Sequence, residues 1–216
     1  MFVLMGQFLA VSDLAQDIVE SCQRWLGHLK GGVGYACIVA STIMAAVIGS
    51  STASVAVMSY AAHPSMHRLG YSPGFAVGII AISGTLAIMI PPSITLILYG
   101  ILTQQSIGKL LIAGIIPGLL TAVGYAITIR IILHFKPEYS PRVDAFKLLE
   151  AVQSLRLIWP ALLLIIVMIG GIYAGVASPT EIGAIGALAS LLIALALGRM
   201  PRGPFMLALK NTAATT

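Results

Sequence analysis

The sequence has very little charge. Only 9% of its 216 residues are Asp, Glu, Lys or Arg, whereas soluble domains carry about 25% charged residues. No acidic residue occurs between Glu20 and Glu138, and a surface facing water cannot be built from such a segment. Hydrophobic residues make up 58% of the chain, and the mean hydropathy is +1.00. The composition therefore excludes a soluble domain and predicts an all-α, polytopic membrane protein embedded in a lipid bilayer.

Cysteine is also scarce, and no targeting signal is visible. Cys22 and Cys37 lack the spacing of metal ligands and suggest no disulfide framework, so we expect both to be packing residues. Residues 1–6 are apolar at once, without the basic region and cleavage site of a secretory signal. We expect them to be the tail of a helix whose beginning is missing, in a chain that is a piece of something larger.

The net charge of +5 comes from lysines and arginines in the connections between apolar runs. This distribution is typical of the positive-inside bias of membrane proteins, and not of a nucleic-acid footprint along one helix. We therefore expect no nucleic acid among the partners.

Residues 1–32 are predicted to contain the end of one helix and then an amphipathic helix. Residues 1–11 are too few to span a bilayer. Ser12 is a good N-cap for the next helix, and Asp13 would lie in its first turn, where the helix dipole favours negative charge. That helix fits two positions equally: in the membrane interface, or packed against other helices at the membrane edge.

Two apolar arms, residues 33–48 and 52–62, flank a small, hydroxyl-rich break at Gly49-Ser50-Ser51. Neither arm spans a bilayer comfortably, and together they are long for one helix. We predict a re-entrant hairpin that enters and leaves on one side, with a single kinked helix as the alternative. The lysines and arginines of the connections favour the hairpin, because it leaves only Lys109 outside.

A second break interrupts the apolar run 74–103. Pro91-Pro92 removes two amide donors, so a regular helix stops there, and Ser93 begins a half-helix. The polar segment 63–73 that precedes this run is expected to be a cytoplasmic connection. Residues 33–106 thus form the predicted hairpin and broken helix.

Length, charge and capping signals define the remaining segments. They are a transmembrane helix at 107–135, a polar cytoplasmic connection at 136–156, two transmembrane helices within 157–198, and a tail at 199–216. The last membrane helix is expected to begin at the capping box Ser178-Pro179-Thr180-Glu181, which explains Glu181 without an intramembrane role.

The two breaks carry the chemistry expected of an ion site. Non-helical backbone at membrane depth is tolerated only where it is buried in protein or lines a polar cavity, and such breaks point to a transporter's binding site. Freed carbonyls and hydroxyls suit Na⁺, and the positive end of a half-helix suits an anion. We predict Na⁺ binding by Gly49, Ser50, Ser51, Thr52, Gly84, Thr85 and Pro91. We predict substrate binding by Ser51, Thr52, Pro92 and Ser93.

The same segment has no carboxylate, and its two histidines lie in the predicted connection. A proton-coupled carrier usually needs an intramembrane Asp, Glu or His in its relay, so Na⁺ is the coupling ion that fits. The alternative is that these hydroxyls only bond to backbone or join neighbouring helices. We predict no other metal and no catalytic residue.

Several motifs occur in the order seen in one transporter family. They are Gly49-Ser50-Ser51-Thr52-Ala53, Gly70-Tyr71, Gly84-Thr85-Leu86, Ile90-Pro91-Pro92-Ser93-Ile94, Tyr99-Gly100, the runs 105–110 and 113–118, and Pro179-Thr180-Glu181. In these motifs the chain resembles the large permease subunit of TRAP transporters, the tripartite ATP-independent periplasmic transporters. The resemblance covers nearly the whole chain. The family's large subunit is longer, and its second half repeats the hairpin and broken helix in inverted topology.

The resemblance implies Na⁺-driven uptake of a small organic acid, such as a C4-dicarboxylate or sialic acid, by an elevator-type mechanism. It also implies a periplasmic substrate-binding protein and a small membrane subunit as partners, and a multi-pass location in the bacterial inner (cytoplasmic) membrane. The family's first sodium site, carried over, falls between residues 49–52 and 84–93. A second ion site and half of the substrate cavity would lie outside this chain.

Two other classes of function compete with transport. Ser50 or Ser51 with His63 is an imaginable serine-hydrolase dyad, but that dyad gives Pro91-Pro92 no role. His63 and His67 have the i, i+4 spacing of metal ligands, but no acidic ligand is near them. A non-transporting scaffold that only packs against other subunits would show no response to sodium.

Overall fold

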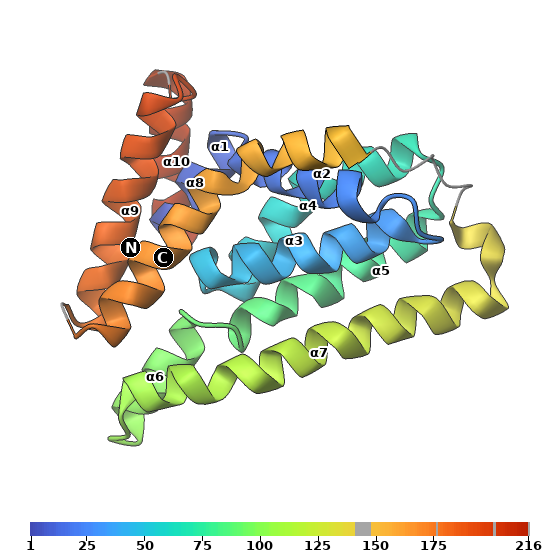
Figure 1. Ribbon diagram of the computed structural model, residues 1–216. Helices are drawn as coiled ribbons and strands as arrows, with labels where there is room; N and C mark the ends of the chain where they lie inside the picture. The colour runs from blue at the N-terminus through green and yellow to red at the C-terminus, as the bar shows by residue number, and fades with distance from the viewer. Residues whose placement is uncertain (141–147, 176, 201, 216) are drawn as a thin grey trace.

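The computed structural model describes residues 1–140, 148–175, 177–200 and 202–215. These residues form α-helices and two short 3₁₀ helices, without a strand among them, as the composition predicted. The helices are α1 (Phe2–Val11), α2 (Leu14–Leu26), α3 (Gly32–Ile48), α4 (Ser51–Arg68), α5 (Pro73–Gly84), η1 (Thr85–Ile88), α6 (Ile94–Leu102), α7 (Ile107–Phe135), η2 (Pro137–Tyr139), α8 (Leu148–Tyr173), α9 (Pro179–Ala196) and α10 (Arg202–Thr215). Figure 1 shows α9 and α10 standing across one end of the other helices, with α7 along the lower edge.

Helices α3 and α4 form a hairpin. Gly49 follows α3 with a left-handed backbone (φ 66°), which residues with a side chain rarely adopt. Ser50 is extended (φ −134°, ψ 128°), and α4 begins at Ser51. The two helices pack against each other and run in opposite directions (Figure 1). The alternative of a single kinked helix is therefore wrong.

The next apolar run is broken, as the sequence predicted. α5 ends at Gly84, the chain continues as the tighter helix η1, and α6 begins only at Ile94. Pro91 and Pro92, joined by a cis peptide bond, lie in the gap. Because proline has no backbone N–H, this gap cannot carry the regular hydrogen bonds of a helix.

α3 is the central helix of the fold. It packs against α1, α2, α4, α5, η1, α7 and α8. Many of its buried residues are small, including Ala36, Ala40 and Ala45, which lets neighbouring helices approach closely. Cys37 is buried in α3 and Cys22 in α2, as expected of packing residues. The hairpin is thus held from several sides along its first arm.

Among the described residues, two helices are long and apolar enough to cross a membrane by themselves. α7 has 29 residues with a mean hydropathy of 2.1 over its best window, and α8 has 26 residues with 2.3. The surface of α7 exposes large aliphatic side chains such as Ile112, Ile116 and Leu120. Such a surface suits lipid or a partner subunit and not water.

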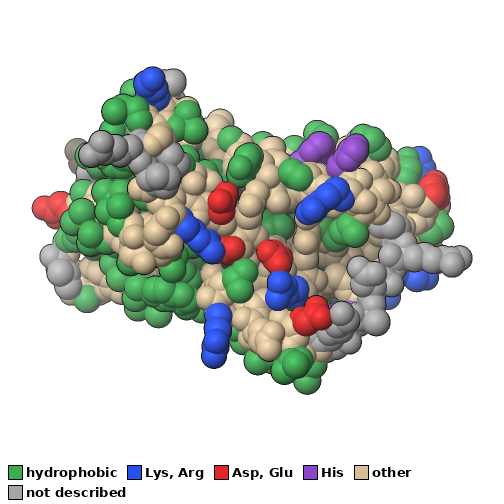
Figure 2. Space-filling view, turned by 90° about the horizontal axis from the view of Figure 1, so that it is seen from above, with side chains coloured by type: hydrophobic (Ala, Val, Ile, Leu, Met, Phe, Trp, Pro, Cys, Tyr) green, Lys and Arg blue, Asp and Glu red, His purple; other side chains and the backbone are tan. Residues whose placement is uncertain are grey.

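Another face of the molecule carries both acidic and basic side chains. Figure 2 views the molecule from above and shows acidic and basic side chains interspersed over this face. Helix α2 contributes two ion pairs: Glu20 with Arg24 at 2.5 Å, and Asp17 with Arg199, which follows α9. The polar side of α2 is therefore paired with other charges, while its apolar side packs against α3 and α8.

The cap predicted for α2 is wrong. Ser12 ends α1, where its buried Oγ donates a hydrogen bond to the carbonyl oxygen of Leu9 at 3.3 Å. Asp13 takes the N-cap position of α2, with a left-handed backbone (φ 59°), and Asp17 lies in the first turn. Of the two positions left open for α2, the contacts with α3 and α8 favour packing against other helices.

Three predicted boundaries also differ. α4 continues through Pro64 to Arg68, so the connection before α5 is shorter than the predicted 63–73. The proline costs the helix one backbone hydrogen bond. The packing of α4 against α3 and α5 offsets this loss. α8 is already helical at Leu148, inside the predicted connection 136–156. The predicted tail contains α10, whose Phe205 ring stacks on Phe8 of α1 at 6.0 Å.

Candidate ion and substrate site

The hairpin tip and the broken helix meet through their backbones. The carbonyl oxygen of Gly49 accepts a hydrogen bond from the amide N–H of Ile94 at 2.9 Å. A Cβ atom added to Gly49 would lie only 2.5 Å from the carbonyl oxygen of Pro92, which is closer than real Cβ atoms approach any atom. Gly49 therefore allows both the left-handed turn and the close approach, and the two breaks lie against each other.

Two helix N-termini converge at this contact. α4 begins at Ser51, directly after the tip, and α6 begins at Ile94, the residue bonded to Gly49. The first amides of a helix have no partner within it, so each N-terminus carries a partial positive charge. Ser50 Oγ and Thr52 Oγ1 lie 3.2 Å apart beside the first of these N-termini. Thr52 is exposed, and Ser50 and Ser51 are half-buried.

Gly84 and Thr85 lie beside the hairpin, but the hydroxyl of Thr85 joins another helix. A Cβ atom on Gly84 would overlap Cγ2 of Val55, about one turn beyond the tip. Thr85 Oγ1 donates a hydrogen bond to the carbonyl oxygen of Ile82 at 2.6 Å and lies 2.8 Å from the Tyr125 hydroxyl of α7. Thr85 therefore links the broken helix to α7, while Gly84 brings its backbone against α4.

Pro91, Pro92 and Ser93 are buried within the break. Ser93 Oγ donates a hydrogen bond to the carbonyl oxygen of Ile88 at 2.5 Å. The same oxygen accepts the N–H of Leu96 at 3.4 Å and so caps α6, as predicted for the start of this half-helix. Because both bonds are to backbone, Ser93 holds the shape of the break in this conformation.

Two further hydroxyl groups lie close to these residues. Ser54 is fully buried, one turn into α4, and its Oγ has no hydrogen-bond partner among the residues that the structure describes. The hydroxyl-rich run from Ser50 to Ser54 was a signal for this residue. No sequence motif pointed to Tyr125, which contacts Thr85 across 40 residues of sequence.

The arrangement is electrically neutral apart from its helix ends. Residues 49–52, 84–85 and 91–93 are glycines, prolines, serines and threonines, and none of them carries a charge. No group of three or more His, Cys, Asp and Glu residues suited to a metal occurs among the described residues. Carbonyl and hydroxyl oxygens can replace the hydration shell of a hard cation such as Na⁺, and two adjacent N-termini can attract a carboxylate.

The structure does not support the serine-hydrolase dyad or a metal site at the two histidines. Ser51 and His63 are 12 residues apart in α4, which is about 18 Å at 1.5 Å per residue, so no dyad forms between them. His63 and His67 do lie near each other, with ring centroids 6.3 Å apart. Within the described part of the chain, no third metal-ligating side chain joins them.

Comparison with known proteins shows which protein family the chain matches. Residues 1–216 match the family described as "Tripartite ATP-independent periplasmic transporter, DctM component". The C4-dicarboxylate TRAP transporter large permease protein DctM of Pseudomonas aeruginosa is 38% identical over 194 residues, covering 90% of this chain and 45% of that protein. The ectoine TRAP transporter large permease protein TeaC of Halomonas elongata is 36% identical over 195 residues, covering 89% of this chain and 45% of that protein.

A third relative is longer. The isethionate TRAP transporter permease protein DctMQ of Oleidesulfovibrio alaskensis is 34% identical over 195 residues, covering 89% of this chain and 30% of that protein. The chain thus spans less than half the length of these relatives.

Proposed function

The chain belongs to the family of the DctM component of tripartite ATP-independent periplasmic transporters, and from this premise we propose that it is part of a sodium-coupled permease for small organic acids. Its relatives are more than twice as long as the segment they share with it. Transport is therefore proposed for a full-length permease, to which these residues contribute one hairpin and one broken helix.

The observation that carries the proposal is the hydrogen bond between Gly49 and Ile94. It joins two irregular backbone segments that would each be costly in lipid, because their polar groups need partners. Transporters place such discontinuous helices at their ion and substrate sites. We therefore assign the first sodium site to this junction, with the carbonyls of 49–52 and 84–91 and the hydroxyls of Ser50, Ser51 and Thr52 as ligands.

Sodium is proposed as the coupling ion because the junction offers only neutral oxygens. A proton relay needs a side chain that titrates, and the residues at the tip and the break have none. A Na⁺ ion needs oxygen ligands without a change in protonation. The positive N-termini of α4 and α6 stay available for a negatively charged substrate.

The proposed substrates are small organic acids, such as C4-dicarboxylates or sialic acid. Two adjacent helix N-termini suit one carboxylate group, with Ser51, Thr52, Pro92 and Ser93 around it. The C4-dicarboxylate permease of Pseudomonas aeruginosa supports this class. The names of the other relatives, which specify ectoine and isethionate, indicate that the identity of the acid differs within the family.

The proposed partners are a periplasmic substrate-binding protein and a small membrane subunit, in the bacterial inner membrane. α7 and α8 are long and apolar enough to cross that membrane alone. The α3–α4 hairpin would enter and leave on one side, because neither arm has the length of a comfortable span. Its movement as part of an elevator-type transport domain is the mechanism that we propose.

Uptake by a reconstituted full-length permease tests the function. With its binding protein and small subunit in proteoliposomes, we expect accumulation of a radiolabelled C4-dicarboxylate only under an inward Na⁺ gradient. Equal uptake with K⁺ in place of Na⁺ would exclude sodium coupling. No uptake of any organic acid, with normal assembly of the subunits, would favour the scaffold alternative instead.

A further inference from the structure

A cavity lies at the end of α3 opposite the hairpin tip. It has a volume of about 530 Å³ and opens where α7 ends and α3 begins. Its lining includes three basic side chains (Lys30, Arg130 and His134), the aromatic residues Tyr35 and Phe135, and Leu133. α3 has 17 residues, so about 25 Å separates this cavity from the tip. The cavity is therefore distinct from the proposed sodium site.

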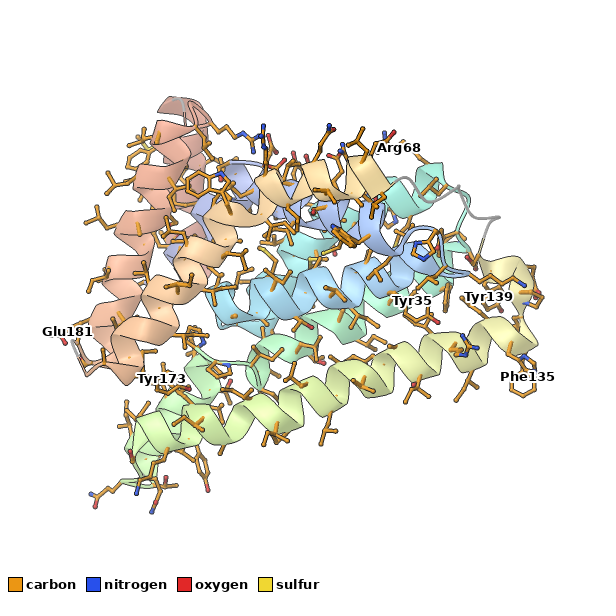
Figure 3. The ribbon with its side chains drawn as sticks, in the orientation of Figure 1. Tyr35, Arg68, Phe135, Tyr139, Tyr173 and Glu181 are labelled. Carbon is orange, nitrogen blue, oxygen red and sulfur yellow. The ribbon has the colours of Figure 1, made fainter. Side chains whose placement is uncertain are left out.

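The length of α7 places this cavity at the surface of a bilayer. Its 29 residues extend about 43 Å at 1.5 Å per residue, whereas the hydrocarbon core of a membrane is about 30 Å thick. Because charged side chains are costly in the hydrocarbon core and favoured near helix ends, we place the last turns, with Arg130 and His134, at the level of the lipid headgroups. Figure 3 shows Tyr35, Phe135 and Tyr139 at the same end of the molecule, where α7 turns into η2.

Within the described part of the chain, Lys30 and Arg130 have no acidic partner. Ion pairs between two described residues involve Arg24 and Arg199. No described carboxylate lies within ion-pair distance of Lys30 or Arg130, and both side chains are exposed. Two cations facing one cavity repel each other unless an anion lies between them.

The cavity walls also contain apolar surface that points to a lipid. Phe135 is 77% exposed at the rim, and Leu133 is half-buried against Gly31 of the turn that precedes α3. Arginine pairs with phosphate through two parallel hydrogen bonds, and lysine adds a compact positive charge. Basic pockets between membrane helices are suited to the headgroups of anionic lipids.

We propose that this cavity binds the phosphate-containing headgroup of an anionic phospholipid. Lys30 and Arg130 contact the phosphate, the Tyr35 hydroxyl and His134 donate hydrogen bonds to the headgroup, and an acyl chain lies along Leu133 and Phe135. The lipid would hold the start of α3, and with it one arm of the hairpin, against the end of α7.

Lipid retention measured by native mass spectrometry tests this site. The full chain, purified in detergent, is titrated with phosphatidylglycerol and, in parallel, with phosphatidylcholine. We expect preferential retention of phosphatidylglycerol. The double variant Lys30→Gln/Arg130→Gln should bind it roughly 20- to 30-fold more weakly, about fivefold for each charge near an anionic lipid. Lys109→Gln, an exposed lysine at the other end of α7, is the matched control and should retain the lipid normally.

Three outcomes would overturn the proposal. They are equal retention of the two lipids, an unchanged double variant, and an equal loss in Lys109→Gln. Displacement of the bound lipid by inorganic phosphate at millimolar concentration would assign the cavity to a free anion instead. If the double variant does not elute as a folded protein, Arg130→Lys and Arg130→Gln replace it. The lysine variant keeps the charge and should retain more lipid, and equal losses would contradict a charged contact.

Discussion

The carbonyl oxygen of Pro92 occupies the space where a side chain on Gly49 would be, 2.5 Å from the position of its Cβ atom. Next to this approach, Gly49 accepts the hydrogen bond of Ile94. The hairpin tip is therefore held by the broken helix directly, through backbone atoms. Because backbone atoms cannot move away as side chains do, this junction is sensitive to single-atom changes.

The variant Gly49→Ala should destabilise the protein. The new Cβ meets Pro92 backbone, and φ of 66° is unfavourable for alanine, so we expect a loss of roughly 2 kcal/mol or more. Thermal unfolding in detergent measures it. Gly78→Ala in α5 is the control, because its Cβ meets nothing within 4 Å and alanine favours a helix. Equal melting temperatures of the two variants would contradict the close approach.

Gly84→Ala should loosen the contact between the broken helix and α4. The added methyl group overlaps Cγ2 of Val55, and overpacking of this kind costs about 1–3 kcal/mol. Val55→Ala removes the overlapping atom, so the double variant should recover part of the lost stability. A double variant that is no more stable than Gly84→Ala would show that another neighbour causes the loss.

Ser51→Ala and Thr52→Ala should each raise the Na⁺ concentration needed for half-maximal uptake by a full-length permease. Removing one neutral oxygen ligand weakens a cation site, and a loss of about 1 kcal/mol corresponds to roughly a fivefold increase. Thr128→Ala is the control, because its exposed hydroxyl only donates to the carbonyl of Gly124 within α7. A sodium dependence that is unchanged in both tip variants would remove these hydroxyls from the site.

The ion pair between Asp17 and Arg199 should stabilise the protein most at neutral pH. The Asp17 side chain is only 15% exposed, and Arg199→Gln would leave its carboxylate without its cation, costing roughly 1–2 kcal/mol near pH 7. Burial raises the pKa of Asp17 above 3.8, and the hydrogen bond and charge of Arg199 oppose this shift. In the variant the pKa should rise further, because the opposing causes are removed.

The direction of the pH effect follows from that raised pKa. A native carboxyl with a pKa above its unfolded value favours folding most below the unfolded value. This contribution is lost as the pH rises through the native pKa. The deficit of Arg199→Gln should therefore be large at pH 7 and shrink as the pH is lowered toward 4 in thermal unfolding. Arg24→Gln, in the more exposed pair with Glu20, is the control with a small effect. A deficit that grows on acidification would contradict the burial of Asp17.

Composition and glycine-proline chemistry were sufficient to predict the main architecture. The hairpin break at Gly49 and the helix break at Pro91-Pro92 are backbone properties of the residues themselves, so they can be read locally. The capping box of α9 is also a local feature. The Ser178 N–H donates a hydrogen bond to Glu181 Oε2 at 2.7 Å, and the Glu181 N–H donates one to Ser178 Oγ at 3.4 Å. Each of these features depends on neighbours within a few residues.

Features that depend on distant packing could not be predicted. Ser12 ends α1, where it bonds to the carbonyl oxygen of Leu9, and it does not cap α2. α4 continues through Pro64 against local preference, in a helix that packs against α3 and α5. At the candidate site, the sequence did not predict that the hydroxyl of Thr85, an expected ion ligand, lies against Tyr125 of α7. No spacing rule relates these two residues. The basic cavity could not be predicted from the sequence either, because its residues Lys30 and Arg130 are 100 positions apart.

Thermal stabilisation by sodium tests the central claim most directly. A full-length permease carrying these residues is unfolded in detergent in NaCl and in KCl at equal ionic strength. An ion that binds only the folded state at ten times its dissociation constant stabilises by about 1.4 kcal/mol, so the melting temperature should be higher in NaCl. The combined variant Ser51→Ala/Thr52→Ala should lose most of this difference. Equal melting temperatures in the two salts would contradict a sodium site at the junction of Gly49 and Ile94.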